Sequence, residues 1–259
     1  PMSPAATPCQ ASPPAQRQRA ARAARIRRQY RTATEVVRVG TLAFPPTRVA
    51  DPDDVLQRSA PLAQAGQQES PAWQPYWALA WDSALALAAR LAGADLAGRS
   101  ILDLGCGLGL TGTVAAARGG QVTMVDAAAP ALLFARLNSW RWRHRVRLRR
   151  LDWQRDRLAE GSFAMILGAD ILYDRQDWPS LEVFWRRHLR RDGQILLGEP
   201  GRRAAADFPA WLADRGWLID RRVHPVRSLA RPVFLYTATP GHEAAAPGDG
   251  SRETRSGRR

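Results

Sequence analysis

Apolar runs and amphipathic segments alternate through the middle of this chain of 259 residues. A short apolar run is typical of a buried strand, and apolar residues spaced three or four apart are typical of a helix. Their alternation predicts an α/β fold, in which a parallel sheet carries helices on both faces. The expected strands are residues 101–104, 121–125, 146–150, 164–169 and 193–198, and the expected helices are residues 77–91, 110–118, 129–140, 178–190 and 204–214.

The C-terminal end of this pattern differs, because two strand-like segments follow each other without a helix of useful length between them. Residues 216–219 begin one strand, and residues 232–236 form the other. Consecutive strands with a short connection pair antiparallel. We therefore expect a mostly parallel sheet that ends in a C-terminal antiparallel hairpin.

The flanking segments are polar and rich in proline. Residues 1–33 hold seven arginines and no acidic residue, which predicts a disordered basic arm, although residues 20–30 could form a short basic helix. Residues 34–70 read as an N-terminal extension with a strand over 35–43. Residues 71–240 are expected to form one domain, and residues 241–259 a disordered tail.

Composition excludes several kinds of chemistry. The net charge is +14, and every one of the 38 basic residues is arginine, so mechanisms that need a lysine of the enzyme are excluded. Two cysteines give no disulfide framework, no apolar run reaches the length of a membrane span, and the histidines lack metal-ligand spacing. We expect a cytoplasmic protein without a metal site. The basic arm is either solvated or a surface for nucleic acid or an acidic partner.

The motif Asp-Leu-Gly-Cys-Gly-Leu-Gly connects the first expected strand to a helix. Asp103 ends the strand, and Gly105, Gly107 and Gly109 follow at alternate positions, where the lack of a Cβ lets a ligand approach the backbone. Asp126 ends the next strand, at the position where a carboxylate can accept hydrogen bonds from ribose hydroxyls. The sequence therefore predicts a nucleotide-type cofactor site at the carboxyl ends of parallel strands.

The glycines also fit the G-x-G-x-x-G pattern of a dinucleotide site over residues 107–112. A carboxylate such as Asp103 would repel a pyrophosphate, whereas it suits a cationic, amino-acid-like group. Together with the C-terminal hairpin, these residues resemble the class I, seven-strand S-adenosylmethionine-dependent methyltransferases. The resemblance implies a Rossmann-like seven-stranded sheet and S-adenosyl-L-methionine as cofactor. In that family the glycine loop holds the methionine moiety and the acid Asp126 the ribose, while Asp152 and Trp153 would face the adenine.

Three further motifs narrow the resemblance: Pro-Tyr-Trp-Ala-Leu-Ala-Trp over residues 75–81, Ala-Asp-Ile-Leu-Tyr over 169–173, and Gly-Glu-Pro-Gly-Arg over 198–202. They are similar to protein-lysine methyltransferases that act on the β-subunit of electron-transfer flavoprotein, although Asp82 stands where that group has a proline. The resemblance implies N-methylation of a lysine in a protein substrate. It assigns Asp170 and Tyr173, the acid and the aromatic residue of the motif over 169–173, to catalysis. Residues of the motifs over 75–81 and 198–202 are assigned to binding.

Methyl transfer is an in-line displacement, so alignment of the reactants supplies much of the acceleration. Asp170 could hold the incoming ammonium and orient the amine, and Tyr173 could form an aromatic wall that attracts the cation. Trp81 could cover the cofactor. The substrate-binding candidates are Trp77, Glu199 and Arg202.

Several alternatives remain open at this point. The aromatic residues could be core, Asp170 a helix cap, and Glu199 with Arg202 a structural turn and ion pair. The acceptor could instead be a small amine of the nicotinamide type. A nucleic-acid base is less favoured, because residues 170–173 lack the two prolines of base-amino methyltransferases. The chain could also be a binding module on the same fold. We expect a monomer with a protein partner and no membrane contact.

Overall fold

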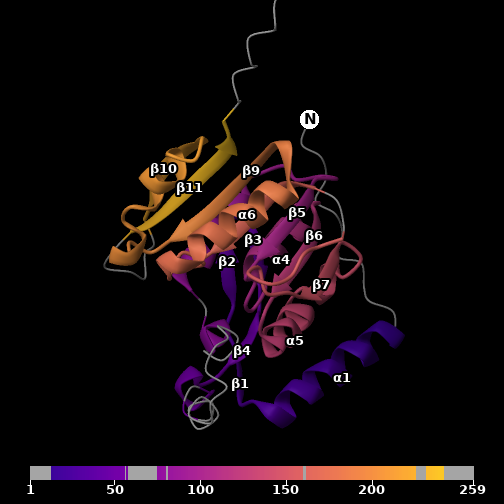
Figure 1. The fold of residues 1–259 in the computed structure, drawn as a ribbon. Coiled ribbons are helices and arrows are strands. Elements are labelled where there is room, and N and C mark those ends of the chain that lie inside the picture. The colour runs from indigo at the N-terminus through magenta and orange to yellow at the C-terminus, as the bar shows by residue number, and fades with distance from the viewer. Residues whose placement is uncertain are drawn as a thin grey trace, which may run out of the picture.

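The structure is a computed structural model, and it describes residues 13–55, 57, 75–79, 81–159, 162–225 and 232–241. A seven-stranded sheet with the order β10-β11-β9-β8-β5-β6-β7 lies at its centre (Figure 1). β5 to β9 pair in parallel, and β11 pairs antiparallel with both β9 and β10, which confirms the predicted fold class. The strands are β5 (Ser100–Leu104), β6 (Gln121–Asp126), β7 (Val146–Arg150), β8 (Phe163–Ala169), β9 (Leu189–Glu199), β10 (Trp217–His224) and β11 (Val233–Pro240).

Two hydrophobic cores lie on opposite faces of the sheet, because successive side chains of a strand point to opposite faces. Leu102 of β5 contributes to the core under α6 (Trp178–His188) and α7 (Phe208–Ala213). Its neighbour Ile101 contributes to the core under α3 (Asp82–Ala92) and α4 (Leu110–Ala117). The sheet is therefore covered on both faces, as its nearly continuous apolar strands require.

The helices follow the predicted pattern, except that two of them are divided. Two 3-10 turns flank the others: η3 (Trp140–Trp142) follows α5 (Ala129–Asn138), and η4 (Arg175–Asp177) precedes α6. The single helix expected over 77–91 is instead η2 (Pro75–Ala78) and α3, because the backbone of Trp81 is extended and interrupts the helix. The helix expected over 204–214 is likewise divided into η5 (Arg203–Ala205) and the short α7.

The N-terminal extension contains two short hairpin-like pairs. β1 (Thr32–Thr34) pairs with β4 (Thr47–Val49), and β2 (Val37–Val39) pairs with β3 (Leu42–Phe44). The single strand expected over 35–43 is wrong, since Gly40 adopts a left-handed conformation, with φ of 57°, and reverses the chain between β2 and β3.

The disordered arm expected over residues 1–33 is wrong for residues 13–33: the alternative of a short basic helix over 20–30 is nearer, but the helix α1 (Pro13–Gln29) is longer and packs on α5. Ile26 is 1% exposed and belongs to a third core with Phe134 of α5. Composition misses this helix because a narrow apolar stripe is enough when a neighbouring helix covers it. Residues 1–12 and 242–259 lie outside the described residues, so the predicted tail stays a prediction. Within the described residues no helix has the length and apolar character needed to cross a membrane.

Candidate functional site

A cavity opens at the carboxyl ends of β5, β6 and β8, the usual place for ligands in open α/β sheets. It holds about 610 Å³ of empty space including its open mouth. Its lining comes from three strand ends, the aromatic segment at η2 and one tryptophan after β7. The lining residues are Tyr76, Trp77, Trp81, Gly105, Gly107, Asp126, Ala127, Ala128, Trp153, Ala169, Asp170, Ile171 and Tyr173.

The three glycines after β5 have different tasks. All three adopt positive φ, at 66°, 50° and 78°, a region that residues with a Cβ rarely enter. A Cβ on Gly107 would meet nothing closer than the carbonyl oxygen of Trp77 at 3.7 Å, so this position faces the cavity. A Cβ on Gly109 would lie 2.8 Å from the Cβ of Ala135. Gly107 therefore permits close approach of a ligand, whereas Gly109 permits close packing of α5.

The two carboxylates of this region are held by backbone N–H groups. Asp126 accepts hydrogen bonds from the N–H of Gly107 at 2.9 Å and from that of Ala128 at 2.8 Å, one on each oxygen. Burial raises the pKa of this carboxyl. Because each oxygen has a second lone pair, Asp126 can still accept hydrogen bonds from hydroxyls of a ligand in the cavity.

Asp103 is buried behind the cavity and does not line it. It accepts the N–H of Gly112 at 2.8 Å, which ties the end of β5 to the first turn of α4. Burial, with a smaller contribution from the charge of Asp126, raises the pKa of Asp103 to about 7. The structure therefore places this predicted cofactor residue behind the glycine loop.

Of the two residues expected near an adenine, one lines the cavity and the other does not. Trp153 lines the cavity, and its buried indole N–H has no hydrogen-bond partner within the described part of the chain. Asp152 instead holds its own turn, accepting the N–H of Gln154 at 3.0 Å and lying 3.9 Å from the guanidinium of Arg155. The structure places Asp152 outside the cavity lining.

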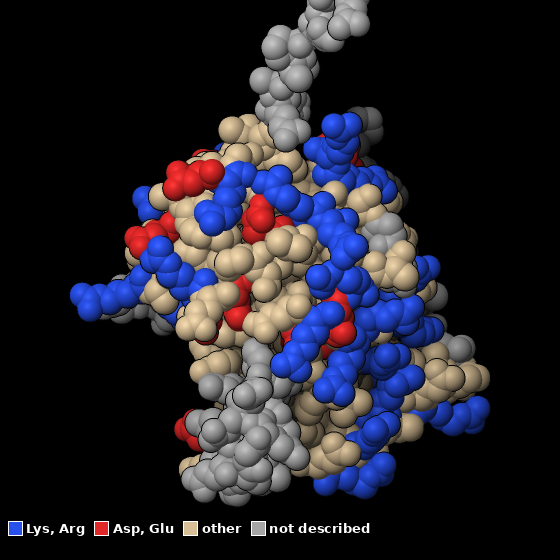
Figure 2. Space-filling model, viewed as in Figure 1, with Lys and Arg blue, Asp and Glu red and all other residues tan. Residues whose placement is uncertain are grey.

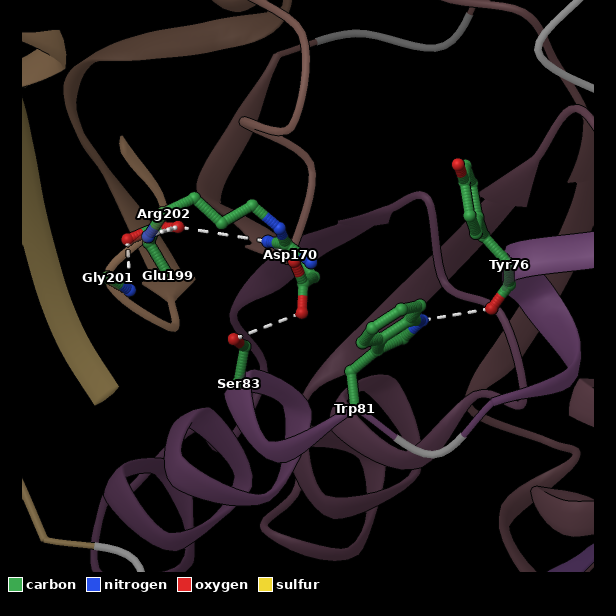
Figure 3. Close-up of polar contacts among 7 residues, drawn as sticks. All are labelled: Tyr76, Trp81, Ser83, Asp170, Glu199, Gly201 and Arg202. Carbon is green, nitrogen blue, oxygen red and sulfur yellow. Dashed lines mark hydrogen bonds and ion pairs between the residues drawn. The ribbon is translucent and has the colours of Figure 1, made fainter. Parts of the chain in front are cut away.

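A cluster of charged groups forms around Asp170, at the end of β8 (Figure 3). Asp170 is 7% exposed and forms an ion pair with Arg202, while the hydroxyl of Ser83 donates to its other oxygen at 3.3 Å. It is the one described non-glycine residue with positive φ, at 64°. Such a backbone is held in place by its surroundings and is typical of functional positions.

Arg202 is held at further points of the same cluster. Its guanidinium lies 3.7 Å from the carboxylate of Glu199 and 5.5 Å from the ring centre of Trp81. The backbone N–H of Arg202 donates to Glu199 at 2.9 Å, and Gly201 donates to the other oxygen (Figure 3). Burial raises the pKa of Glu199 and lowers that of Arg202. Glu199 therefore fixes the turn that aims Arg202 at Asp170.

Aromatic rings form the opposite part of the cavity wall. Tyr76 lies 5.8 Å from Tyr173 and 6.2 Å from Trp81 between ring centres, and the indole N–H of Trp81 donates to the Tyr76 carbonyl at 2.9 Å. Burial, with smaller contributions from nearby charges, raises the pKa of Tyr173, so its hydroxyl stays neutral. The sequence did not predict two residues of this site, Tyr76 and Ser83. Tyr76 belongs to the aromatic motif over residues 75–81 but had no assigned role, and no sequence signal distinguishes Ser83 from other serines at the start of a helix.

Metal ligands are not gathered anywhere in the described ranges, where no group of three or more His, Cys, Asp or Glu side chains could hold an ion. The lining of the cavity is largely aromatic and apolar. Its two acidic lining residues are Asp126, on the side of the glycine loop, and Asp170; Arg202, the ion-pair partner of Asp170, and Glu199 lie behind the lining.

Comparison with known proteins gives a consistent result. A family model described as lysine methyltransferase matches residues 76–208, which is half of the chain. The chain is 39% identical over 128 residues to protein N-lysine methyltransferase METTL21A of Xenopus tropicalis, covering 46% of this chain and 58% of that protein. It is 29% identical over 168 residues to the electron transfer flavoprotein beta subunit lysine methyltransferase of Xenopus laevis, covering 61% and 67%. The match thus spans less than two thirds of the first of these relatives.

Solved structures share the fold at low identity. A complex of DhpI with SAH superposes with a TM-score of 0.51 at 17% identity, covering 74% of this chain and 95% of that one. The glycopeptide N-methyltransferase MtfA complexed with S-adenosylmethionine gives a TM-score of 0.50 at 17% identity, covering 60% and 86%. At this identity the likeness extends to the fold alone.

Proposed function

This chain belongs to the lysine methyltransferase family, and from that premise we propose that it is an S-adenosylmethionine-dependent enzyme that N-methylates a lysine of a protein substrate. Family membership confirms the resemblance seen in the sequence motifs. The observation that supports the activity best is one cavity lined by Gly107 and Asp126 on one side and by Asp170 and Tyr173 on the other. We further propose residues 71–240 as the methyltransferase domain, since the hairpin β10–β11 completes the sheet beyond the matched segment.

The residues around the glycine loop fit the proposed cofactor. The space a Cβ would fill at Gly107 is open, and the carboxylate of Asp126 has free lone pairs for ribose hydroxyls. Trp153 offers an apolar face and an N–H that has no partner among the described residues, and Trp81 covers the cavity beside η2. Asp103 acts from behind by holding the start of α4. When bound, S-adenosylmethionine supplies the electrophilic methyl group.

The acceptor side of the cavity fits a primary amine. Asp170 and the rings of Tyr76 and Tyr173 attract the ammonium form and align it, whereas only the neutral amine can attack a methyl group. Arg202 already pairs with Asp170, so its positive charge opposes a second cation at the same carboxylate. In this proposal Asp170 and Tyr173 are catalytic, Trp77 and Glu199 shape the acceptor site, and Arg202 favours loss of the ammonium proton.

The setting of the reaction is proposed from the sequence. We place the protein in the cytoplasm, which two cysteines and a free buried Cys106 support. An acidic protein substrate suits the net charge of +14. A monomer suits the scattered distribution of large exposed apolar side chains on the described surface.

The proposal is tested by labelling with methyl-tritiated cofactor. Lysate from the native organism lacking this gene is incubated with the wild-type protein or with the Asp170→Asn variant, and protein, nucleic acid and small molecules are separated. We expect a labelled protein band with the wild type and about 10²-fold less label with the variant, while cofactor affinity changes only a few-fold. Label confined to small molecules or nucleic acid would assign the enzyme to a rival class of acceptor.

A further inference from the structure

A groove containing three arginines runs between α1 and α5. Arg22 and Arg25 of α1 lie on one wall, and Arg136 of α5 lies on the other, together with Gln18, Ala21, Ile26 and Leu133. The α1 residues are spaced three, four and seven apart, so they share one face of the helix. The face of α1 that packs on α5 through Ile26 therefore also places Arg22 and Arg25 beside Arg136.

Among the residues that the structure describes, these three guanidinium groups have no acidic partner. None of the ion pairs found in the described ranges includes Arg22, Arg25 or Arg136. The sequence contains no Asp or Glu over residues 1–34 or 127–151. Burial and the charge of Arg22 lower the pKa of Arg136. Like charges gathered in one groove are unfavourable alone, and an anion between them would relieve the repulsion.

The groove is built to keep its shape. The guanidinium of Arg22 lies 5.3 Å from the ring centre of Trp140, which also carries Arg143 at 5.1 Å. Trp140 itself is buried in the turn after α5. This cation–π contact restrains the Arg22 guanidinium beside the groove, so less conformational entropy is lost when a ligand binds it.

The groove lies on a strongly basic part of the surface. In Figure 2 the blue atoms gather on the side where Figure 1 shows β7, α5 and α1. Residues 139–151, which include η3 and β7, hold six arginines and no acidic residue. A positive field of this kind attracts polyanions and raises the rate of encounter.

The far end of α1 touches the wall of the candidate active site. Tyr30, just after the helix, lies 5.6 Å from Trp77 between ring centres, and Trp77 lines the cavity. A chain segment bound along α1 is therefore held on an element that contacts the site of the proposed reaction. That position suits a macromolecular substrate more than a small ligand.

We propose that the groove between α1 and α5 is a docking site for an acidic segment of the protein substrate, whose Asp or Glu carboxylates are received by Arg22, Arg25 and Arg136. The identity of the partner rests on the proposed function. Guanidinium groups bind carboxylates with paired hydrogen bonds. Sites for single-stranded nucleic acid add exposed aromatic rings, and none of the large exposed apolar side chains of the described residues lies on α1, α5, η3 or β7.

The test measures binding of a fluorescently labelled deca-glutamate peptide to the full chain by anisotropy, with deca-glutamine as the uncharged peptide. The groove variant is Arg22→Gln/Arg25→Gln/Arg136→Gln. The matched control is Arg19→Gln/Arg27→Gln/Arg28→Gln, which removes the same charge from exposed positions of α1 that do not line the groove. Melting temperature and binding of S-adenosylhomocysteine establish that each variant is folded.

We expect the groove variant to lose about tenfold or more in affinity for deca-glutamate and the control to lose less than about threefold, because scattered surface charges contribute little each. Equal losses in both variants, or no binding by the wild type, would overturn the proposal. Tighter binding of duplex or single-stranded RNA through the same three arginines would overturn the stated partner. Peptide binding requires no methyl transfer, so an absence of methyl-lysine product would refute the proposed function and leave this result intact.

Discussion

Replacement of Arg202 by methionine tests how the acceptor site treats charge. Arg202 does not line the cavity itself, but its guanidinium contacts Asp170 and Trp81, which do, so its charge lies next to the proposed acceptor side. A unit charge about 6 Å from an amine contributes about 2.8 kcal/mol at an effective dielectric constant of about 20, or about two pKa units. The Arg202 side chain is 28% exposed, and solvent screening therefore reduces the expected effect to about one unit.

The sign of the effect follows from the protonation of the acceptor. Removal of the positive charge stabilises the ammonium form of the substrate lysine and raises its pKa, so less neutral amine is present at a given pH. The acidic limb of the kcat profile, which reports groups in the enzyme–substrate complex, should therefore move about one unit to higher pH in Arg202→Met, and kcat should approach the wild-type value at high pH. Arg202→Lys keeps the charge and should keep the profile.

The measurement is a pH series of initial rates at saturating concentrations of the cofactor and of one protein substrate. Arg203→Met is the matched control, because Arg203 is the exposed neighbour in sequence. Loss of one partner of a buried ion pair can cost about 3–5 kcal/mol of stability, so melting curves must first show that the variant is folded. A profile that falls in parallel at every pH, or an acidic limb that moves to lower pH, would refute the electrostatic role of Arg202.

Three further predictions concern the cofactor side and the basic helix. Gly107→Val should weaken S-adenosylhomocysteine binding more than about tenfold in calorimetry, because a side chain would enter the cavity at φ of 50°; unchanged affinity would remove the loop from the cofactor site. Asp103 has a pKa raised from 3.8 to about 7, so the native state binds the extra proton, and stability of the ligand-free protein should fall as pH rises from about 4 to 7, by up to about 4 kcal/mol. Asp103→Asn should flatten this dependence in chemical denaturation, and an equally steep curve would assign it to other groups. Ile26→Ala should cost about 2–4 kcal/mol or release α1, seen as faster hydrogen exchange over residues 13–29, whereas unchanged exchange would show that Ile26 does not hold the helix.

The sheet was predictable because its signal is local. Mostly apolar runs such as residues 101–104 and 164–169 are typical of strands buried on both faces of a sheet. The alternation of such strands with helices then predicts a parallel sheet. α1 was not predictable in the same way. Its sequence is mostly arginine and alanine, and its stability depends on contacts of Ile26 with α5, more than 100 residues away in the chain. Composition cannot report a contact of that kind.

The candidate site also contains residues whose neighbours the sequence predicts and residues whose neighbours it does not predict. Gly107 and Asp126 could be predicted as neighbours because parallel strands end at one edge of the sheet. The pairing of Arg202 with Asp170 depends on how Glu199 holds the turn after β9, and the sequence does not encode that geometry in a spacing. Asp152 stands at the position in sequence where a cofactor contact was expected, but its carboxylate accepts a hydrogen bond within its own turn. Position in the sequence alone could not show this.

The most direct test of the proposed activity is the chemical identity of the methylated product. Protein labelled by the enzyme from methyl-deuterated S-adenosylmethionine is hydrolysed to amino acids and analysed by mass spectrometry, with the Asp170→Asn variant in parallel. We expect deuterated N-methyl-lysine with the wild-type enzyme and about 10²-fold less with the variant. Deuterium in another amino acid, or in no amino acid while a small amine or nucleic acid carries it, would contradict the assignment of a protein lysine as acceptor.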